Sequence, residues 1–137
     1  MLGYLLDTDH LTLFQHGHPM VIHRLGSHLP GTVGLSVVTA EEMLRGRLAR
    51  VSRAADARAR IGHYKLLNET LQLFVRFPVV AHDQAVEGEF QRIRHIRIGT
   101  QDLKIAATAL ANQIPLVTGN RRDFAQVPGL VIEDWSV

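Results

Sequence analysis

The sequence contains no cysteine among its 137 residues, which excludes disulfide bonds, thiolate metal ligands and cysteine nucleophiles. A chain without cysteine fits the reducing environment of the cytoplasm, where we expect this protein to act. The sequence also lacks the run of about eighteen apolar residues that a membrane-spanning helix needs. Its first residues carry no basic lead and only a short apolar stretch before Asp7, so we do not expect a signal peptide.

Aromatic residues make up only 6% of the chain, so base stacking on an aromatic platform is not the expected way of binding nucleic acid. No G-x-G-x-x-G motif follows the first expected strand, which argues against a dinucleotide site. The only lysines are Lys65 and Lys104, and neither lies where a phosphate-accepting receiver domain needs one. This argues against the main alternative outside the enzymes, a non-catalytic α/β module that binds Mg²⁺.

The composition of the chain is that of a folded domain, with 46% hydrophobic and 20% charged residues. We expect a single domain with its own core over residues 1–137. The formal net charge of +2 is a small basic excess, which fits a polyanionic partner without requiring one. The eight histidines include no H-E-x-x-H or comparable pair, so we do not expect a zinc site. His10 either is partly exposed at the surface, the interpretation that we favour, or approaches the functional cleft.

Short apolar runs alternate with longer amphipathic stretches, a pattern typical of an α/β domain with a mainly parallel sheet. Strands are expected over residues 2–6, 33–38, 77–80, 116–117 and, at the edge, 130–132. The first helix is expected to begin at Thr8 or Asp9, one of which would be its cap. Thr39 and Glu42 fit a capping box for the second helix, and Thr100 is the expected cap of a helix over 101–112. Further helices are expected over 45–74, with an arginine-rich face, and over 83–97.

Four acidic residues fall at equivalent places in this layout: Asp7, Glu42, Asp102 and Asp123 each lie at a strand end or in the first turns of a following helix. In a parallel α/β sheet these places converge on one edge, so the four carboxylates are expected to share a cleft. Each acid taken alone is better explained as a helix cap or as a partner of the helix dipole. Their common edge is the reason to consider them together.

Carboxylates packed in one cleft repel each other unless a cation lies between them. Ligation by oxygen alone suits Mg²⁺ or Mn²⁺, and such ions can activate water and neutralise charge on a phosphodiester. The remainder of the chain is rich in arginine, which can hold neighbouring phosphates of a polyanion. The residues therefore point to metal-dependent cleavage of a nucleic acid.

Four segments carry a family resemblance: YLLDTDHL from Tyr4, VVTAEEMLRG from Val37, IGTQDLKIAATAL from Ile98 and LVTGNRRDF from Leu116. In this order and spacing they resemble the motifs of the PIN-domain ribonucleases, and most closely those of the VapC toxins of toxin–antitoxin pairs. The resemblance extends from about Leu5 to Trp135. It implies a single PIN domain, with a mainly parallel central sheet of four or five strands flanked by helices.

The resemblance also implies roles for individual residues. Asp7 and Asp102 match the principal metal ligands of the family, and Glu42 matches the acid of its E-[LM]-x-x-G helix. Many members have an aspartate where this chain has Asn120, and a common variant, T-x-N-x-x-D-F, matches Thr118 to Phe124. We therefore expect Asn120 to assist by hydrogen bonding and Asp123 to supply the fourth acid, directly or through water.

Neighbouring residues have two interpretations each. Thr8 and Thr118 either hydrogen-bond to a ligand carboxylate or only close a helix or strand, and Asp9 either contacts a metal-bound water or caps a helix. Glu41 is expected to face solvent. Arginines that either contact RNA or a partner, or simply form a solvated surface, are Arg45, Arg47, Arg50, Arg53, Arg121 and Arg122.

By resemblance we expect a Mg²⁺- or Mn²⁺-dependent endoribonuclease that is the toxin of a VapBC-type pair. Its partners would be RNA, a small VapB-type antitoxin that blocks the cleft, and a second copy of the chain. The apolar helical stretch from Ile61 to Phe74 is the candidate dimer face. The alternative enzyme is a PIN nuclease that acts in RNA processing, or on DNA, outside any toxin pair.

Overall fold

The computed structural model describes residues 1–137 and confirms an α/β fold built on one parallel sheet. The strands are β1 (Tyr4–Leu6), β2 (Val33–Ser36), β3 (Val79–Val80), β4 (Leu116–Val117) and β5 (Ile132–Glu133). The helices are α1 (Thr8–Gln15), α2 (Pro19–Gly26), α3 (Val37–Ser52), α4 (Ala57–Arg76), α5 (Gln84–Ile93), α6 (Thr100–Asn112) and α7 (Arg121–Phe124). The strand order is β3-β2-β1-β4-β5, and every pair of neighbours is parallel.

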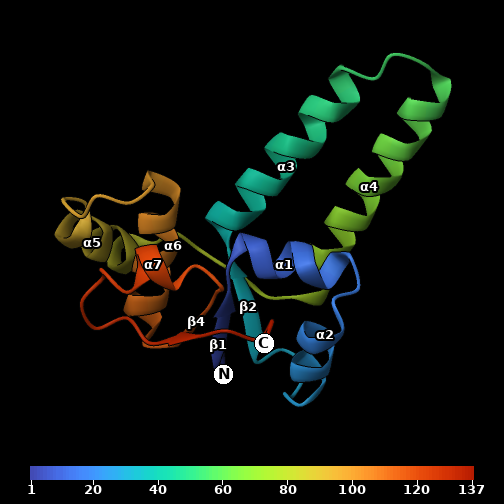
Figure 1. The fold of residues 1–137 in the computed structure, drawn as a ribbon. Coiled ribbons are helices and arrows are strands. Elements are labelled where there is room, and N and C mark those ends of the chain that lie inside the picture. The colour runs from blue at the N-terminus through green and yellow to red at the C-terminus, as the bar shows by residue number, and fades with distance from the viewer.

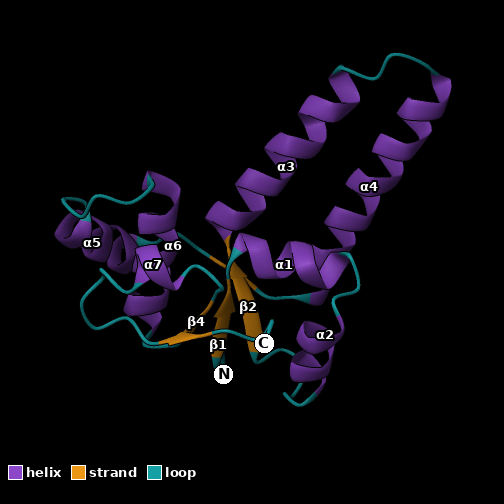
Figure 2. Ribbon diagram, in the orientation of Figure 1, coloured by secondary structure: helices purple, strands orange, loops and turns teal.

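Helices cover both faces of the sheet (Figure 1). Helices α5, α6 and α7 lie on one side, and α1 to α4 lie on the other, as the secondary-structure colouring of Figure 2 shows. Consecutive residues of the strands point into the two different layers, because side chains alternate along a strand. Leu5 and Leu116 join the core under α5 and α6, whereas Leu6 and Val117 join the core under α1 and α3. Burial of both faces explains why the strands are continuous apolar runs.

Helices α3 and α4 form an antiparallel hairpin that projects from the sheet (Figure 1). The arginine-rich stretch is broken between them, and α4 begins after Asp56, whose side chain accepts a hydrogen bond from the Ala59 backbone N–H. The outer part of α4 exposes apolar side chains, including Ile61 at 72%. None of the helices combines the length and the apolar character needed to cross a membrane.

Three predicted helix starts are wrong. Asp7, rather than Thr8 or Asp9, caps α1, and its carboxylate accepts from the backbone N–H of His10. The second strand ends at Ser36, not at residue 38, and the Ser36 hydroxyl caps α3 by accepting from Val38 N–H. A capping residue typically has an extended backbone itself. Asp7 and Ser36 have this conformation because the chain leaves the sheet at these two residues. Thr39 is therefore a buried residue inside α3.

The third wrong start is that of α6, which begins at Thr100 with Gly99 at the cap position and no capping side chain. Helix α5 is shorter than expected and ends at Ile93, and the last strand lies at Ile132–Glu133 instead of 130–132. Helices α2 and α7 were not predicted. Strand boundaries otherwise differ from the expectation by one or two residues, as at β1 and β3.

Candidate active site

The carboxyl ends of β1, β2 and β4, the three central strands, lead directly into the candidate site. Asp7 follows β1 and is 4% exposed. Its Oδ1 accepts the backbone N–H of His10 at 2.8 Å, which fixes the carboxylate at the start of α1. Because the cap uses Oδ1, the second oxygen, Oδ2, remains for another partner. The cap and the ligand role expected for Asp7 are therefore compatible.

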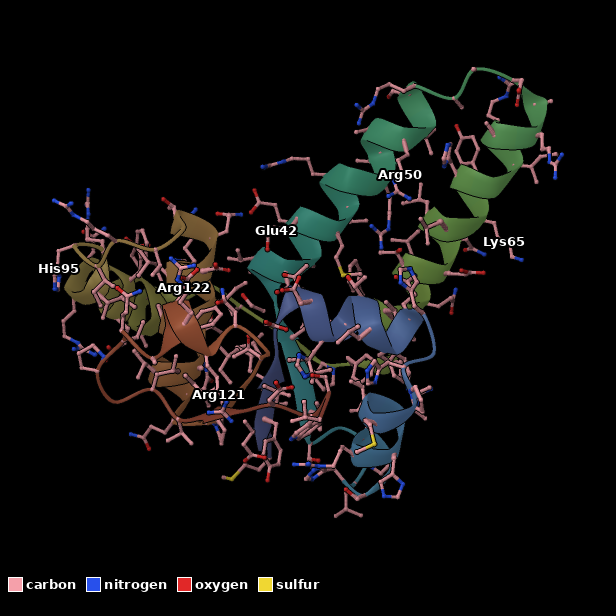
Figure 3. The ribbon with its side chains drawn as sticks, in the orientation of Figure 1. Glu42, Arg50, Lys65, His95, Arg121 and Arg122 are labelled. Atoms are coloured by element: carbon pink, nitrogen blue, oxygen red, sulfur yellow. The ribbon has the colours of Figure 1, made fainter.

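Glu42 enters the site from the second turn of α3, and Figure 3 places it at the foot of that helix. Its Oε1 accepts a hydrogen bond from the Thr8 hydroxyl at 2.9 Å. The Thr39 hydroxyl lies 3.2 Å from the same Thr8 oxygen. Thr8 therefore links the start of α1 to the acid of α3, as one of its two interpretations predicted, and it does not cap a helix.

Asp102 lies in the first turn of α6, and its pKa indicates how the acids are arranged. Burial raises the pKa of Asp102 to about 6, and the negative charge of Glu42 is the next largest cause. Further contributions that raise the pKa come from Asp7, Asp123 and Asp9. The four predicted acids therefore lie within electrostatic range of one another although they come from distant parts of the chain.

Asp123 belongs to the short helix α7, which Asn120 caps. The Asn120 amide Nδ2 donates to Asp123 Oδ2 at 3.1 Å, and Asn120 Oδ1 accepts from the Asp123 N–H at 3.3 Å. The buried Thr118 hydroxyl accepts in turn from the Asn120 N–H at 3.0 Å. The expected hydrogen bonding by Asn120 is thus present, and it orients the fourth acid.

Asp9 lies on the exposed side of α1. Its pKa is raised, first by partial desolvation and then by Asp7, while His10 lowers it. Asp9 is therefore within range of the cluster but is not a helix cap.

The residues fit a hard cation by their chemistry. All four acids offer oxygen, the donor that Mg²⁺ and Mn²⁺ prefer, and the raised pKa of Asp102 shows that their negative charges oppose one another. As the side chains are placed, no three acidic or histidine groups stand close enough to enclose one ion together. The donor types and the clustered negative charge thus fit a hard cation by chemistry alone.

His10 is buried beside the candidate site, so the favoured prediction of a partly exposed surface position is wrong, whereas the alternative, an approach to the cleft, agrees with the structure. The ring is 1% exposed, and its Nδ1 lies 3.4 Å from Asp7 Oδ1. Nε2 lies 3.4 Å from Asp134 Oδ1 and accepts the backbone N–H of Trp135 at 3.2 Å, so a neutral ring carries its proton on Nδ1. His10 therefore connects the C-terminal segment to the first acid. No local pattern predicts the contact with the C-terminal segment, because Asp134 and Trp135 lie more than 120 residues away.

The arginines differ in their surroundings. Arg45 is exposed and pairs with Glu41 at 2.7 Å, and Glu41 faces solvent as expected. Arg121 and Arg122 are exposed on α7 (Figure 3), the short helix that also contains Asp123. Arg47 is half-buried and is not part of a solvated face, since it donates to Thr70 and Gln15.

The chain is an α/β domain whose five-stranded parallel sheet has acidic residues along its carboxyl edge. A model of the family described as "PIN domain" matches residues 4–130, and the chain belongs to this family.

Two relatives match nearly the whole chain. It is 26% identical to the tRNA(fMet)-specific endonuclease VapC of Salmonella typhimurium, over 98% of this chain and 99% of that protein. It is 27% identical to Ribonuclease VapC1 of Rickettsia felis, over 96% and 95% of the two chains. Among solved structures, DNA-bound VapBC from Salmonella typhimurium superposes with a TM-score of 0.81 at 24% identity, over 98% of this chain and 99% of that one.

Proposed function

We propose that this protein is an endoribonuclease that hydrolyses RNA phosphodiesters and acts as the toxin of a VapBC-type toxin–antitoxin pair. The observation that carries the proposal is that Asp7, Glu42 and Asp123 lie within electrostatic range of the half-buried Asp102, at the carboxyl edge of the parallel sheet. Similarity along the whole chain to two ribonucleases of the VapC type supports both the reaction and the substrate class.

We further propose that the reaction depends on Mg²⁺ or Mn²⁺, held by Asp7, Asp102 and Glu42, with Asp123 as a direct or water-bridged fourth group. A bound ion of this kind would supply a more acidic water and neutralise negative charge on the phosphate. The donor set of oxygens and the raised pKa of Asp102 support this assignment.

The protein's own residues prepare this site. The Thr8 hydroxyl holds one oxygen of Glu42, and the Asn120 amide holds one oxygen of Asp123, so both carboxylates are oriented before substrate arrives. The exposed guanidinium groups of Arg121 and Arg122 can contact the phosphates that flank the scissile bond. Acids at the reacting centre and arginines beside it match the charge requirements of a polyanionic substrate.

The partners proposed are a small VapB-type antitoxin and a second copy of the chain, and the proposed place of action is the cytoplasm. A solved structure with the same fold is a toxin–antitoxin complex from Klebsiella pneumoniae, which superposes with a TM-score of 0.71 at 22% identity. The exposed apolar side chains of α4, among them Ile61, Tyr64 and Leu71, support a protein contact on the hairpin.

The test of the active site is Asp7→Asn, assayed by cleavage of RNA with Mg²⁺ or Mn²⁺ and after addition of EDTA. Wild-type protein should cleave, chelation should stop the cleavage, and Asp7→Asn should reduce it at least about 100-fold because a metal-binding charge is lost. Asparagine also caps helices well, so the fold should persist.

The matched control for this variant is Asp56→Asn. Asp56 caps α4 as Asp7 caps α1, and each accepts a backbone N–H at 2.8 Å. Only Asp7 lies at the acid cluster, so Asp56→Asn should cleave RNA as wild type does. Undiminished cleavage by Asp7→Asn would refute the assigned centre.

A further inference from the structure

Gly46 lies in the interior of α3, and neither its backbone conformation nor its packing within the chain requires a glycine. A glycine inside a helix destabilises it relative to alanine, so a reason for the residue is to be expected. Its φ angle is not positive, which removes the usual conformational reason. A Cβ atom built on Gly46 would meet no heavy atom within 4 Å, which removes close packing as well.

The open space above Gly46 is part of a hollow of about 330 Å³, lined by Glu42, Arg45, Gly46, Ala49 and Gln101. Gly46 follows Glu42 by one helical turn and therefore lies on the same face of α3. Gln101 directly precedes Asp102 in α6. The hollow thus begins beside two of the four acids of the candidate active site. Its volume lies at the lower end of the range for small-molecule sites, which is roughly 300–1,000 Å³.

Polar groups at the rim of this hollow are held in place but remain accessible. The Arg45 guanidinium pairs with Glu41, and the Gln101 amide donates to the other oxygen of Glu41 at 3.1 Å. The Arg45 side chain is still 71% exposed, so several of its N–H groups face solvent. A surface ion pair of this kind is weak, and a phosphate can share or replace the carboxylate.

We propose that this hollow receives the nucleotide adjacent to the scissile phosphate. The missing side chain at Gly46 lets the sugar or base approach the backbone of α3, and Arg45 contacts the phosphate of that nucleotide. The inference rests on the proposed ribonuclease function. It adds a binding role for Gly46 and, of the two interpretations of Arg45, it selects contact with RNA, because a carboxylate repels phosphate and the acids cannot fulfil this role.

The test uses Gly46→Ala, with Gly62→Ala as the matched control. Gly62 is also inside a helix, α4, has no positive φ, and has no heavy atom within 4 Å of a built Cβ, but it does not line this hollow. Both variants should raise Tm by about 2–4 °C, because alanine replaces a helical glycine. Only Gly46→Ala should raise the KM for RNA, at least about 5-fold, with little change in kcat.

A second measurement separates this inference from the proposed function. Binding of a labelled RNA oligonucleotide is measured in the Asp7→Asn background, with and without Gly46→Ala, Gly46→Leu or Gly62→Ala. The Kd should rise with the size of the side chain at position 46 and stay constant for Gly62→Ala. Equal Kd and KM for all variants would overturn the inference even if wild type cleaves RNA. Absence of cleavage by wild type would refute the proposed function, while the Kd series would still report on the hollow.

Discussion

The single hydroxyl of Thr8 determines how one carboxylate of the site is held. It donates to Glu42 across 34 positions of sequence, and Asp7 rather than Thr8 caps the helix on which Thr8 lies. Thr8→Val removes the hydroxyl and keeps the shape, so we expect kcat/KM for RNA cleavage to fall about 10- to 100-fold. Thr8→Ser, which retains the donor, should stay within a few-fold of wild type. Equal activity of the valine and serine variants would show that this hydrogen bond has no role in the reaction.

A site residue could be predicted where neighbouring residues in the sequence indicate its position in the fold. Asp7, Glu42, Asp102 and Asp123 were predicted because a strand end or helix start is visible in the neighbouring letters, and parallel topology brings such places together. Burial of His10 was not predicted, since it depends on the Trp135 backbone reaching the start of α1. The cap of α1 was placed one or two residues too late, at Thr8 or Asp9, because a cap can shift by one residue without changing the apolar pattern.

At the scale of helices, Arg47 joins the projecting hairpin to the rest of the protein. From α3 it donates to Thr70 of α4 and to Gln15 of α1, and burial, followed by the charge of Arg50, lowers its pKa. Arg47→Ala leaves both acceptors without this donor, so we expect the free energy of unfolding to fall by about 1–2 kcal/mol. Urea unfolding followed by circular dichroism measures this loss.

The control for the hairpin is Arg50→Ala on the same helix. Arg50 is exposed, so its replacement should change stability by no more than about 0.5 kcal/mol. Similar losses for both variants would show that the Arg47 contacts add nothing specific. The sequence predicted helices with an arginine-rich face here, but nothing in it distinguished Arg47 from the other arginines as a residue that joins helices. Its partners lie 23 and 32 positions away, beyond the reach of helical periodicity.

For the whole molecule, the acid cluster lowers the free energy of unfolding, although the proposed reaction needs these carboxylates. Because the folded state raises the pKa of Asp102 from 3.8 to about 6, it binds this proton more tightly than the unfolded chain does. The contribution of Asp102 to stability is therefore greatest below about pH 4 and is lost as the pH rises through about 6. If the carboxylates hold a cation as proposed, the ionised cluster lowers the free energy of unfolding when the cation is absent.

This conflict predicts how a cation affects stability at different pH values. Added Mn²⁺ should raise Tm more at pH 7.5, where Asp102 is ionised, than at pH 5, where much of it is protonated. Asp102→Asn should raise the Tm of the metal-free protein at pH 7.5, because a repelled charge is removed, and should abolish most of the response to Mn²⁺. Thermal unfolding of both proteins at the two pH values, with EDTA or Mn²⁺, measures all of these effects. A response to Mn²⁺ that is the same at both pH values, or that persists in Asp102→Asn, would place the cation elsewhere. A cation bound at Asp102 must compete with the proton for this carboxylate, so its effect on Tm must depend on pH and on the presence of Asp102.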